Sequence, residues 1–93
     1  MNDPSKSLGE FVGKEVVLDT RGTFVFMGTL ESVDACFYVL AEADVHDGSE
    51  GASSKEIYVL EALKYGIRQN RHRVFVRTDE VISLSLLSDV IEY

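Results

Sequence analysis

The sequence predicts a mainly β protein: a small, strongly bent five-stranded barrel with a short N-terminal helix and a second helix inserted between strands three and four. Three observations predict this fold class. Short segments rich in apolar, aromatic and β-branched residues are separated by turn signals. A glycine interrupts the longest of these segments, where a sharply bent strand needs one. A tight corner joins the last two segments, and small barrels suit this order of strands.

Length and composition limit the domain organisation. A chain of 93 residues forms one domain, because it is too short to bury two separate hydrophobic cores. Its apolar fraction of 45% and charged fraction of 27% are those of an ordinary globular protein and argue against disorder. A domain of this size buries little surface by itself, so we expect self-association to add stability.

Charge and cysteine content limit the partners and the compartment. The formal net charge of −7 opposes nonspecific attraction to phosphate backbones and anionic membranes, although a local basic or aromatic pocket remains compatible with it. The single cysteine, Cys36, allows no disulfide within the chain and fits a reducing compartment. No apolar run approaches transmembrane length, and the first residues lack a signal-peptide pattern. We therefore expect a cytoplasmic protein without a membrane partner.

The first half of the chain predicts a helix and three strands. Leu8, Phe11 and Val12 share one helical face after a serine cap, which predicts a short helix over 5–12 that ends near Gly13. Gly28 lies inside the longest strand and predicts its bend or the close approach of another backbone. The three strands are expected at 14–20, 23–34 and 36–43, with a turn at 21–22.

Residues 44–70 form a polar loop followed by a further element. The composition of 44–54 predicts an exposed loop, and Ser53 and Glu56 have capping-box spacing. A helix from Ser54 to Tyr65, closed by Gly66, is the preferred interpretation. A strand is the alternative, because the segment EIYV contains β-branched residues. Apolar residues cover a wide arc of this helix, which predicts that something covers it: its own barrel, an adjacent subunit or a second ring.

Two strands end the chain. Residues 71–77 alternate as a strand does, with Arg71, Arg73, Phe75 and Arg77 opposite His72, Val74 and Val76. Residues 81–87 form a last strand, with Ile82, Leu84 and Leu86 on one side. Thr78, Asp79 and Glu80 make the tight corner between them. The tail, 88–93, either continues the last strand or packs back on the barrel.

The sequence resembles the Sm-like (Lsm) family of small SH3-like barrels. The first family motif is similar to LGEFVGKEVVL (8–18), FMGTLESVD (26–34) and the apolar run behind them. The second is similar to VRTDEVISLS (76–85), and residues 44–70 lie outside the resemblance. The resemblance implies one Sm-like domain over 1–93, acting by assembly and binding.

The resemblance also implies an RNA pocket, with departures. In the family, an Asn four residues after the motif aspartate holds the base and a nearby aromatic or His stacks on it; here Tyr38 and Cys36 occupy these positions after Asp34. The family's Arg-Gly becomes Arg77-Thr78. Arg77 would contact phosphate or a base edge, and Tyr38 would stack on a base. Asp34 would orient Arg77 or accept a hydrogen bond from a base. The structural alternative is a core tyrosine, an aspartate that caps a turn, and an arginine paired with that aspartate.

Assembly is the firmest implication of the resemblance. Sm-like proteins form closed rings in which the fourth strand of one subunit pairs with the fifth of its neighbour, and we expect a ring of about five to seven copies. The alternative is that the corner only closes a monomeric barrel. The predicted interface residues are Arg73, Val74, Phe75, Val76, Val81, Ile82, Ser83 and Leu84.

Catalytic and metal chemistry are not expected. Asp44, His46, Asp47 and Glu50 lack the spacing of a calcium loop, and one His is too few for zinc, so a solvated acidic loop without metal is predicted. Cys36 lacks a neighbouring group that would lower its pKa and is expected to be a small buried hydrophobe. No cofactor motif is found, and the protein is predicted not to be an enzyme.

The function predicted is therefore that of a homo-oligomeric ring that serves as an RNA-associated scaffold with an altered pocket. Single-stranded RNA is the candidate partner beside the chain itself. The basic residues Arg68, Arg71, His72 and Arg73 either form a nucleic-acid rim or balance neighbouring acids. The alternative function is a structural or protein-interaction ring that has lost RNA binding, which the acidic charge favours.

Overall fold

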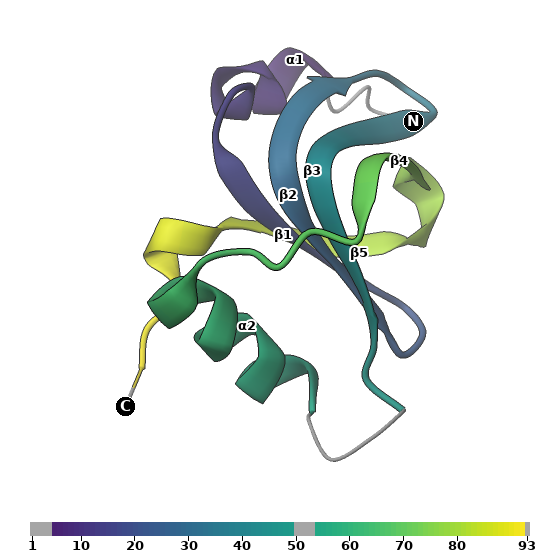
Figure 1. The fold of residues 1–93 in the computed structure, drawn as a ribbon. Helices are drawn as coiled ribbons and strands as arrows, with labels where there is room; N and C mark the ends of the chain where they lie inside the picture. Colours follow the sequence, from purple (N-terminus) through teal and green to yellow (C-terminus); the bar gives the residue numbers. More distant parts are fainter. Residues whose placement is uncertain (1–4, 50–53, 93) are drawn as a thin grey trace.

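The computed structural model describes residues 5–49 and 54–92 and confirms the predicted fold class (Figure 1). Five antiparallel strands form one sheet, and a helix lies between the third and fourth strands. The elements in chain order are α1 (Ser5–Leu8), η1 (Gly9–Phe11), β1 (Glu15–Thr20), β2 (Phe24–Val33), β3 (Phe37–Asp47), α2 (Lys55–Tyr65), β4 (Arg71–Arg77), η2 (Thr78–Glu80), β5 (Val81–Leu86) and η3 (Leu87–Asp89).

The sheet is open rather than closed on itself. Its strand order is β4-β3-β2-β1-β5, so the two strands that follow each other across the corner η2 lie at opposite edges. Figure 1 shows β2 and β3 curving sharply through the molecule, which gives the sheet its barrel-like shape. Each outer strand has one neighbouring strand within the chain: β3 for β4, and β1 for β5. The corner therefore does not close the barrel by pairing β4 with β5.

Gly28 allows β2 to bend where β3 crosses it. A Cβ at this position would lie 2.9 Å from the carbonyl oxygen of Ala41 and 3.1 Å from the Cα of Ala43, so no side chain fits. The β2–β3 register also shifts between Met27 and Thr29, at the same point. The predicted bend and close approach at Gly28 are confirmed.

The sheet buries side chains on both faces. The concave side encloses a core to which the N-terminal helical turns contribute Leu8 and Phe11. The other side of the sheet is covered by α2 and the C-terminal turn, so the expectation that the helix packs on its own barrel is confirmed for one face. The first core contains Val16, Leu18, Leu30, Tyr38, Leu40, Ala43 and Val76, and the second contains Val17, Val25, Met27, Ala62 and Leu87.

The inserted segment differs from the prediction at its start. Residues 44–47 continue β3, where Asp44 pairs with Met27 and Asp47 with Phe24, so the strand does not end at Ala43. Backbone pairing with the long β2 outweighs the polar composition on which the loop prediction depended. The helix itself is confirmed and the strand alternative is wrong. Its cap is Ser54, whose Oγ accepts from the amide of Ile57, whereas Ser53 lies outside the described residues.

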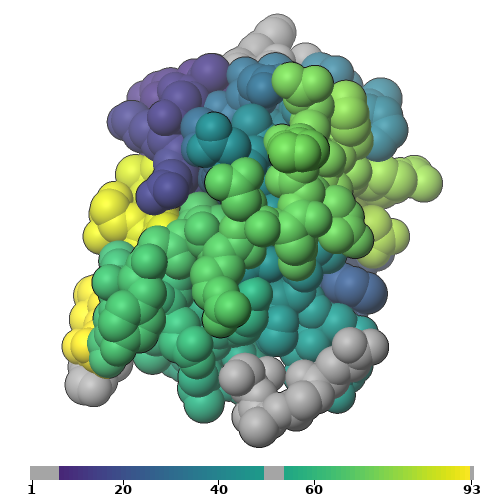
Figure 2. Space-filling model, viewed as in Figure 1, coloured from purple at the N-terminus to yellow at the C-terminus, as the bar shows by residue number. Residues whose placement is uncertain are grey.

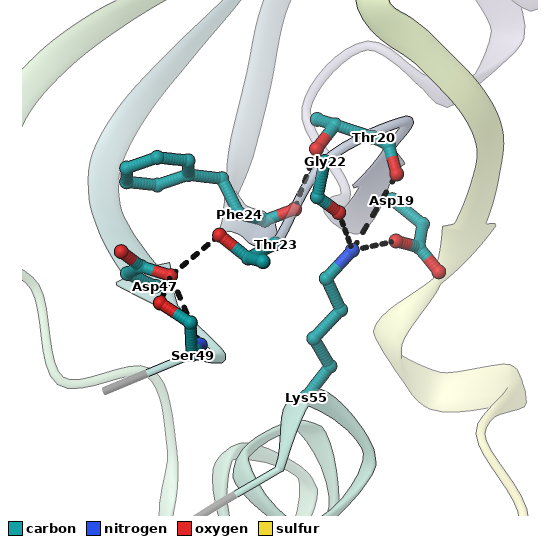
Figure 3. Close-up of polar contacts among 8 residues, drawn as sticks. All are labelled: Asp19, Thr20, Gly22, Thr23, Phe24, Asp47, Ser49 and Lys55. Carbon is teal, nitrogen blue, oxygen red and sulfur yellow. Dashed lines mark hydrogen bonds and ion pairs between the residues drawn. The ribbon is translucent and has the colours of Figure 1, made fainter. Parts of the chain in front are cut away.

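A lysine at the start of α2 fastens the helix to the end of β1 and the turn that follows it (Figure 3). The Nζ of Lys55 lies 2.7 Å from Oδ1 of Asp19 and 2.7 Å from the carbonyl oxygen of Gly22. A Cβ on Gly48 would lie 2.9 Å from Cγ of Lys55, so the lysine stem passes over a residue without a side chain. The helix is thus held at its first residue to the turn between β1 and β2.

The C-terminal residues pack back instead of extending β5. Leu87 is buried in the second core, and Val90 packs against the same cluster. Figure 2 shows the yellow C-terminal residues lying beside α2 on the surface. The alternative in which the tail continues the last strand is wrong for the residues described.

Candidate functional site

The turn between β2 and β3 is built around Asp34. Its Oδ1 accepts from the amides of Cys36 at 2.8 Å and Phe37 at 2.7 Å, which is the geometry of an aspartate that caps a turn. The alternative in which this aspartate caps a turn is therefore correct. Cys36 is exposed in the turn, and its prediction as a buried hydrophobe is wrong because β3 begins one residue later.

Thr78 fastens the end of β4 to this turn. Its amide donates to the carbonyl oxygen of Cys36 at 2.9 Å, and its hydroxyl donates to that of Ala35 at 2.8 Å. A threonine at this position thus supplies a side-chain contact that a glycine lacks. The second motif and the β2–β3 turn are consequently held side by side.

Arg77 lies at the same end of the sheet but does not pair with Asp34. Its Nη2 lies 2.8 Å from Oδ2 of Asp79, two residues along the chain, and 68% of its side chain is exposed. The prediction that Asp34 orients or pairs with Arg77 is wrong, because the Asp34 carboxylate holds the turn amides. An exposed ion pair of this kind contributes little to stability and leaves the guanidinium accessible.

A hollow of about 330 Å³ lies between the turn and the end of β4. Phe37 contributes an exposed aromatic ring, which meets Phe75 edge-on with ring centroids 6.0 Å apart. Phe37 is the residue that the sequence analysis missed, although its position on the face opposite Tyr38 is a usable signal. The hollow is lined by Ala35, Cys36, Phe37, Arg77, Thr78 and Asp79.

Tyr38 is separated from this hollow. Only 6% of it is exposed, it packs in the first core, and burial raises the pKa of its hydroxyl. The structure thus makes it a core tyrosine and contradicts a stacking role for it. Of the predicted pocket residues, Asp34, Cys36, Arg77 and Thr78 are brought together and Tyr38 is not.

The basic residues near β4 are partly balanced by acids. Arg73 forms an ion pair with Glu31 on β2, with Nε 3.0 Å from Oε1. Arg71 donates from Nη1 to the carbonyl oxygen of Asn70. The interpretation of this cluster as charges that balance neighbouring acids is therefore correct for Arg73.

The predicted acidic loop contains a buried polar cluster instead. Asp44, 1% exposed, accepts from the hydroxyl of Tyr58 at 2.6 Å and from Nδ2 of Asn70 at 3.0 Å. Burial and the hydrogen bond to Asp44 raise the pKa of Tyr58 to about 12, and the ring of His46 stacks on Tyr58 at 3.7 Å. Asp47 accepts from the hydroxyl of Thr23.

This cluster joins β3 to α2 and corrects the prediction of a solvated loop at 44–47. Within the described residues, no group of three or more His, Cys, Asp or Glu side chains is placed to hold a metal ion. Glu50, the fourth residue of the predicted acidic group, lies outside that part of the chain.

The predicted interface residues lie on the two edges of the sheet. On β4, Val74 and Val76 face the first core, whereas Phe75 points outward and is 61% exposed. On β5, Leu84 pairs with the core residue Leu18 and Val81 pairs with Thr20, and both pack against the first core. Ile82 lies at a register shift between them and is 63% exposed, so the prediction that it shares one side with Leu84 is wrong. The remaining predicted interface residues are Arg73 and Ser83.

Among residues 5–49 and 54–92, no helix has both the length and the apolar character needed to cross a bilayer.

The fold is shared with solved structures of Sm proteins. The structure of a Pyrococcus abyssii Sm protein in complex with a uridine heptamer superposes with a TM-score of 0.61 at 20% identity, covering 91% of this chain and 99% of that one. This chain has the Sm-like fold. An Sm-like protein from Archaeoglobus fulgidus gives a TM-score of 0.57 at 20% identity, covering 92% of this chain and 96% of that one.

The Sm-like fold also relates this chain to a protein complex. A chain of the NatC complex bound to Gag peptide and CoA gives a TM-score of 0.56 at 18% identity, covering 85% of this chain and 89% of that chain. No family model and no curated protein sequence matches the chain. At these identities the likeness establishes the fold alone.

Proposed function

We propose that this Sm-like chain assembles into a homo-oligomeric ring and serves as an RNA-associated scaffold rather than as an enzyme. The observation that carries the proposal is the pair of outer strands, β4 and β5, at opposite edges of one open sheet. An outer strand presents a row of backbone donors and acceptors to its surroundings, and pairing with another chain is the common way to satisfy them. Two such edges on one subunit allow head-to-tail pairing, which closes into a ring.

The side chains on these edges favour pairing of β4 with β5 of a neighbour. Facing in a sheet alternates with period two, so the core-facing Val74 and Val76 of one copy must meet core-facing residues of the next. Val81 and Leu84 occupy that face of β5 and pack against the first core. Antiparallel pairing thus continues the apolar core across the subunit boundary. Ile82, which the single chain leaves exposed, belongs to the same edge strand. A ring of about five to seven copies is the expected product.

The RNA site of the proposal is the hollow beside the β2–β3 turn. Phe37 supplies a ring on which a base stacks, and Arg77, at the end of β4, supplies a cation for phosphate. Asp34 holds the turn that precedes Phe37. Identical copies around a ring repeat this hollow at a regular spacing, which suits the repeating backbone of a single strand. Likeness to the Sm protein solved with a uridine heptamer supports this assignment.

The second candidate is a structural or protein-interaction ring without RNA. Arg77 is already engaged by Asp79, and the formal net charge of −7 repels phosphate. The likeness to a chain within the NatC complex supports this candidate. In that case the edges serve assembly and the hollow remains unused.

A titration with short single-stranded oligoribonucleotides separates the two candidates. We expect binding at low salt that weakens at least tenfold in Arg77→Ala, with fluorescence anisotropy as the readout. Arg71→Ala is the matched control, because it removes the same charge at the other end of β4. Equal losses in both variants would reject the hollow as the site, and no binding to any strand would favour the interaction ring.

A further inference from the structure

A second hollow, of about 200 Å³, lies between α2 and β3 and shares no lining residue with the hollow beside the β2–β3 turn. Tyr58, Ala62 and Tyr65 line it from α2, at the spacing of one helical face. The small side chain of Ala62 leaves room between the two tyrosines. Asp44 of β3, 1% exposed, is the most buried residue of the lining. The hollow therefore combines two aromatic rings with a buried carboxylate.

The buried carboxylate of Asp44 is contacted by neutral donors. Its Oδ2 accepts from the hydroxyl of Tyr58 at 2.6 Å, and its Oδ1 accepts from Nδ2 of Asn70 at 3.0 Å. A carboxylate can accept at about four positions, so both oxygens retain acceptor capacity. None of the ion pairs among the described residues includes Asp44. A buried charge is costly without a partner, and a cation in the hollow would supply one.

A second carboxylate, that of Glu61, lies at the exposed rim of the hollow. Lys64, one turn along the helix, pairs with Glu92 instead. Arg68 also lines the hollow, but within 5–49 and 54–92 it forms no ion pair with Glu61 or Asp44. Two carboxylates against one guanidinium leave an excess of one negative charge in the lining. This excess favours a cationic ligand over an anionic one.

The ring of Tyr58 is already held in position. Its hydroxyl donates to Asp44, and the ring of His46 stacks on it with centroids 3.7 Å apart. Tyr65, at the other end of the hollow, is 79% exposed and offers its ring to solvent. The face of an aromatic ring attracts a cation, and rings beside carboxylates suit organic ammonium groups. A site held in this way loses little conformational freedom on binding.

We propose that this hollow binds an organic ammonium group, with Asp44 and Glu61 as its anionic partners and the ring of Tyr65 as a cation–π surface. The group belongs to a small free amine or to a lysine side chain of a partner, which present the same chemistry. The volume of about 200 Å³ suits the end of an alkylamine, since sites for drug-sized ligands occupy roughly 300–1,000 Å³. The proposal goes beyond assembly and RNA binding and requires neither.

Titration with n-butylammonium chloride, followed by amide chemical shifts, tests the hollow. We expect saturable shifts at the amides of Asp44, Glu61 and Tyr65. Sodium butyrate at the same ionic strength has a chain of similar length with the opposite charge, and it should give no such shifts. Saturable shifts with butyrate but not with butylammonium would overturn the proposal.

The rim charges give a matched set of variants. Glu61→Gln removes one carboxylate and should weaken butylammonium binding about threefold, because the group is exposed. Glu56→Gln is the control, since Glu56 is an exposed acid of the same helix that does not line the hollow. Arg68→Gln removes the guanidinium of the lining and should strengthen binding. Equal losses in the two glutamate variants, or weaker binding in Arg68→Gln, would contradict a cation site.

The ring and the buried charge are tested separately. Tyr65→Leu keeps an apolar side chain but removes the ring, and binding should weaken about twofold or more. Asp44→Asn keeps the size of the side chain and removes its charge, and binding should weaken about tenfold in a protein that remains folded. If Asp44→Asn does not fold, the exposed variants decide the question. Unchanged affinity in both Tyr65→Leu and Glu61→Gln would overturn the proposal.

A pentapeptide with blocked ends and one lysine among glycines distinguishes the two sources of the ammonium group. Shifts at the same amides, with an affinity similar to that of butylammonium, assign the hollow to a lysine side chain. Shifts with butylammonium alone assign it to a free amine. Glu61→Gln should leave native mass and RNA affinity unchanged, so this site and the proposed function fail separately. If neither probe gives saturable shifts, the ammonium site is rejected and the ring and its RNA site are unaffected.

Discussion

The ammonium group of Lys55 lies 2.7 Å from the carboxylate of Asp19, which joins the first residue of the inserted helix to the end of the first strand. The two residues are 36 positions apart in the sequence. The same ammonium also donates to the carbonyl oxygens of Thr20 and Gly22 (Figure 3). Lys55 thus adds an ion pair to the apolar packing that joins this insertion, which lies outside the family resemblance, to the sheet.

Replacing Lys55 tests this connection. Lys55→Met keeps most of the side-chain length but removes the ion pair and the donors, so we expect the free energy of unfolding to fall by about 1 kcal/mol, since the pair is partly exposed. Urea unfolding at one fixed protein concentration measures the change, because self-association also contributes to stability. Lys14→Met, which removes a lysine on the N-terminal side of β1, is the control. Equal losses in both variants would show that Lys55 has no special role.

The bend at Gly28 predicts a specific steric cost. Gly28→Ala places a Cβ 2.9 Å from the backbone oxygen of Ala41, which cannot move without shifting β3. We expect a loss of about 2 kcal/mol in the free energy of unfolding. Gly22→Ala is the matched control, since a Cβ at Gly22 meets no atom within 4 Å. A stable Gly28→Ala protein would contradict the close crossing of β2 and β3.

The buried contact between Tyr58 and Asp44 predicts a pH dependence at alkaline pH. The pKa of Tyr58 rises from its ordinary value of 10.0 to about 12 in the folded chain, so folding favours the protonated phenol. Its contribution to stability is complete below pH 10.0 and is lost as the pH rises toward about 12. Unfolding experiments across this range should show a smaller decline in Tyr58→Phe than in the wild type.

The same substitution has an effect at neutral pH. Tyr58→Phe removes a donor from the buried Asp44 carboxylate, and we expect a loss of about 1–3 kcal/mol in the free energy of unfolding. Tyr65→Phe, an exposed hydroxyl on the same helix, is the control and should change little. If the stability of Tyr58→Phe and of the wild type declines identically at alkaline pH, the contact between Tyr58 and Asp44 is not the cause of the decline.

The assignment of Phe37 rather than Tyr38 to the RNA site has its own test. Phe37→Leu removes the stacking surface from the hollow, and we expect RNA binding to weaken by about 1–3 kcal/mol. Tyr38→Phe retains the packing of the first core and should leave RNA affinity unchanged. Anisotropy titrations of both variants give the comparison, and a larger loss in Tyr38→Phe would reverse the assignment.

The sequence predicted most of the fold because local patterns determine it. The alternation in 71–77, the glycine in the long strand and the helical spacing after Ser54 each correspond to an observed element. The extension of β3 to Asp47 was missed because its polar residues resemble a loop and its pairing partners lie at 24–27. Pairing between distant segments carries no local signal.

The candidate site was predicted less completely for the same reason. Asp34, Cys36, Arg77 and Thr78 are brought together as the motifs indicate. Which of two adjacent aromatics faces outward depends on where β3 begins, and a shift of one residue exchanges Phe37 for Tyr38. The ion pairs of Arg77 with Asp79 and of Lys55 with Asp19 follow from side-chain placement, which composition and spacing do not determine.

Native mass in dilute solution tests the central claim, assembly through the edges of the open sheet, most directly. Light scattering coupled to size exclusion should give a single species of about five to seven chains. Ile82→Lys should remove this species, whereas Val12→Lys, at an exposed position on neither edge, should preserve it. A wild-type mass of one or two chains would contradict edge pairing.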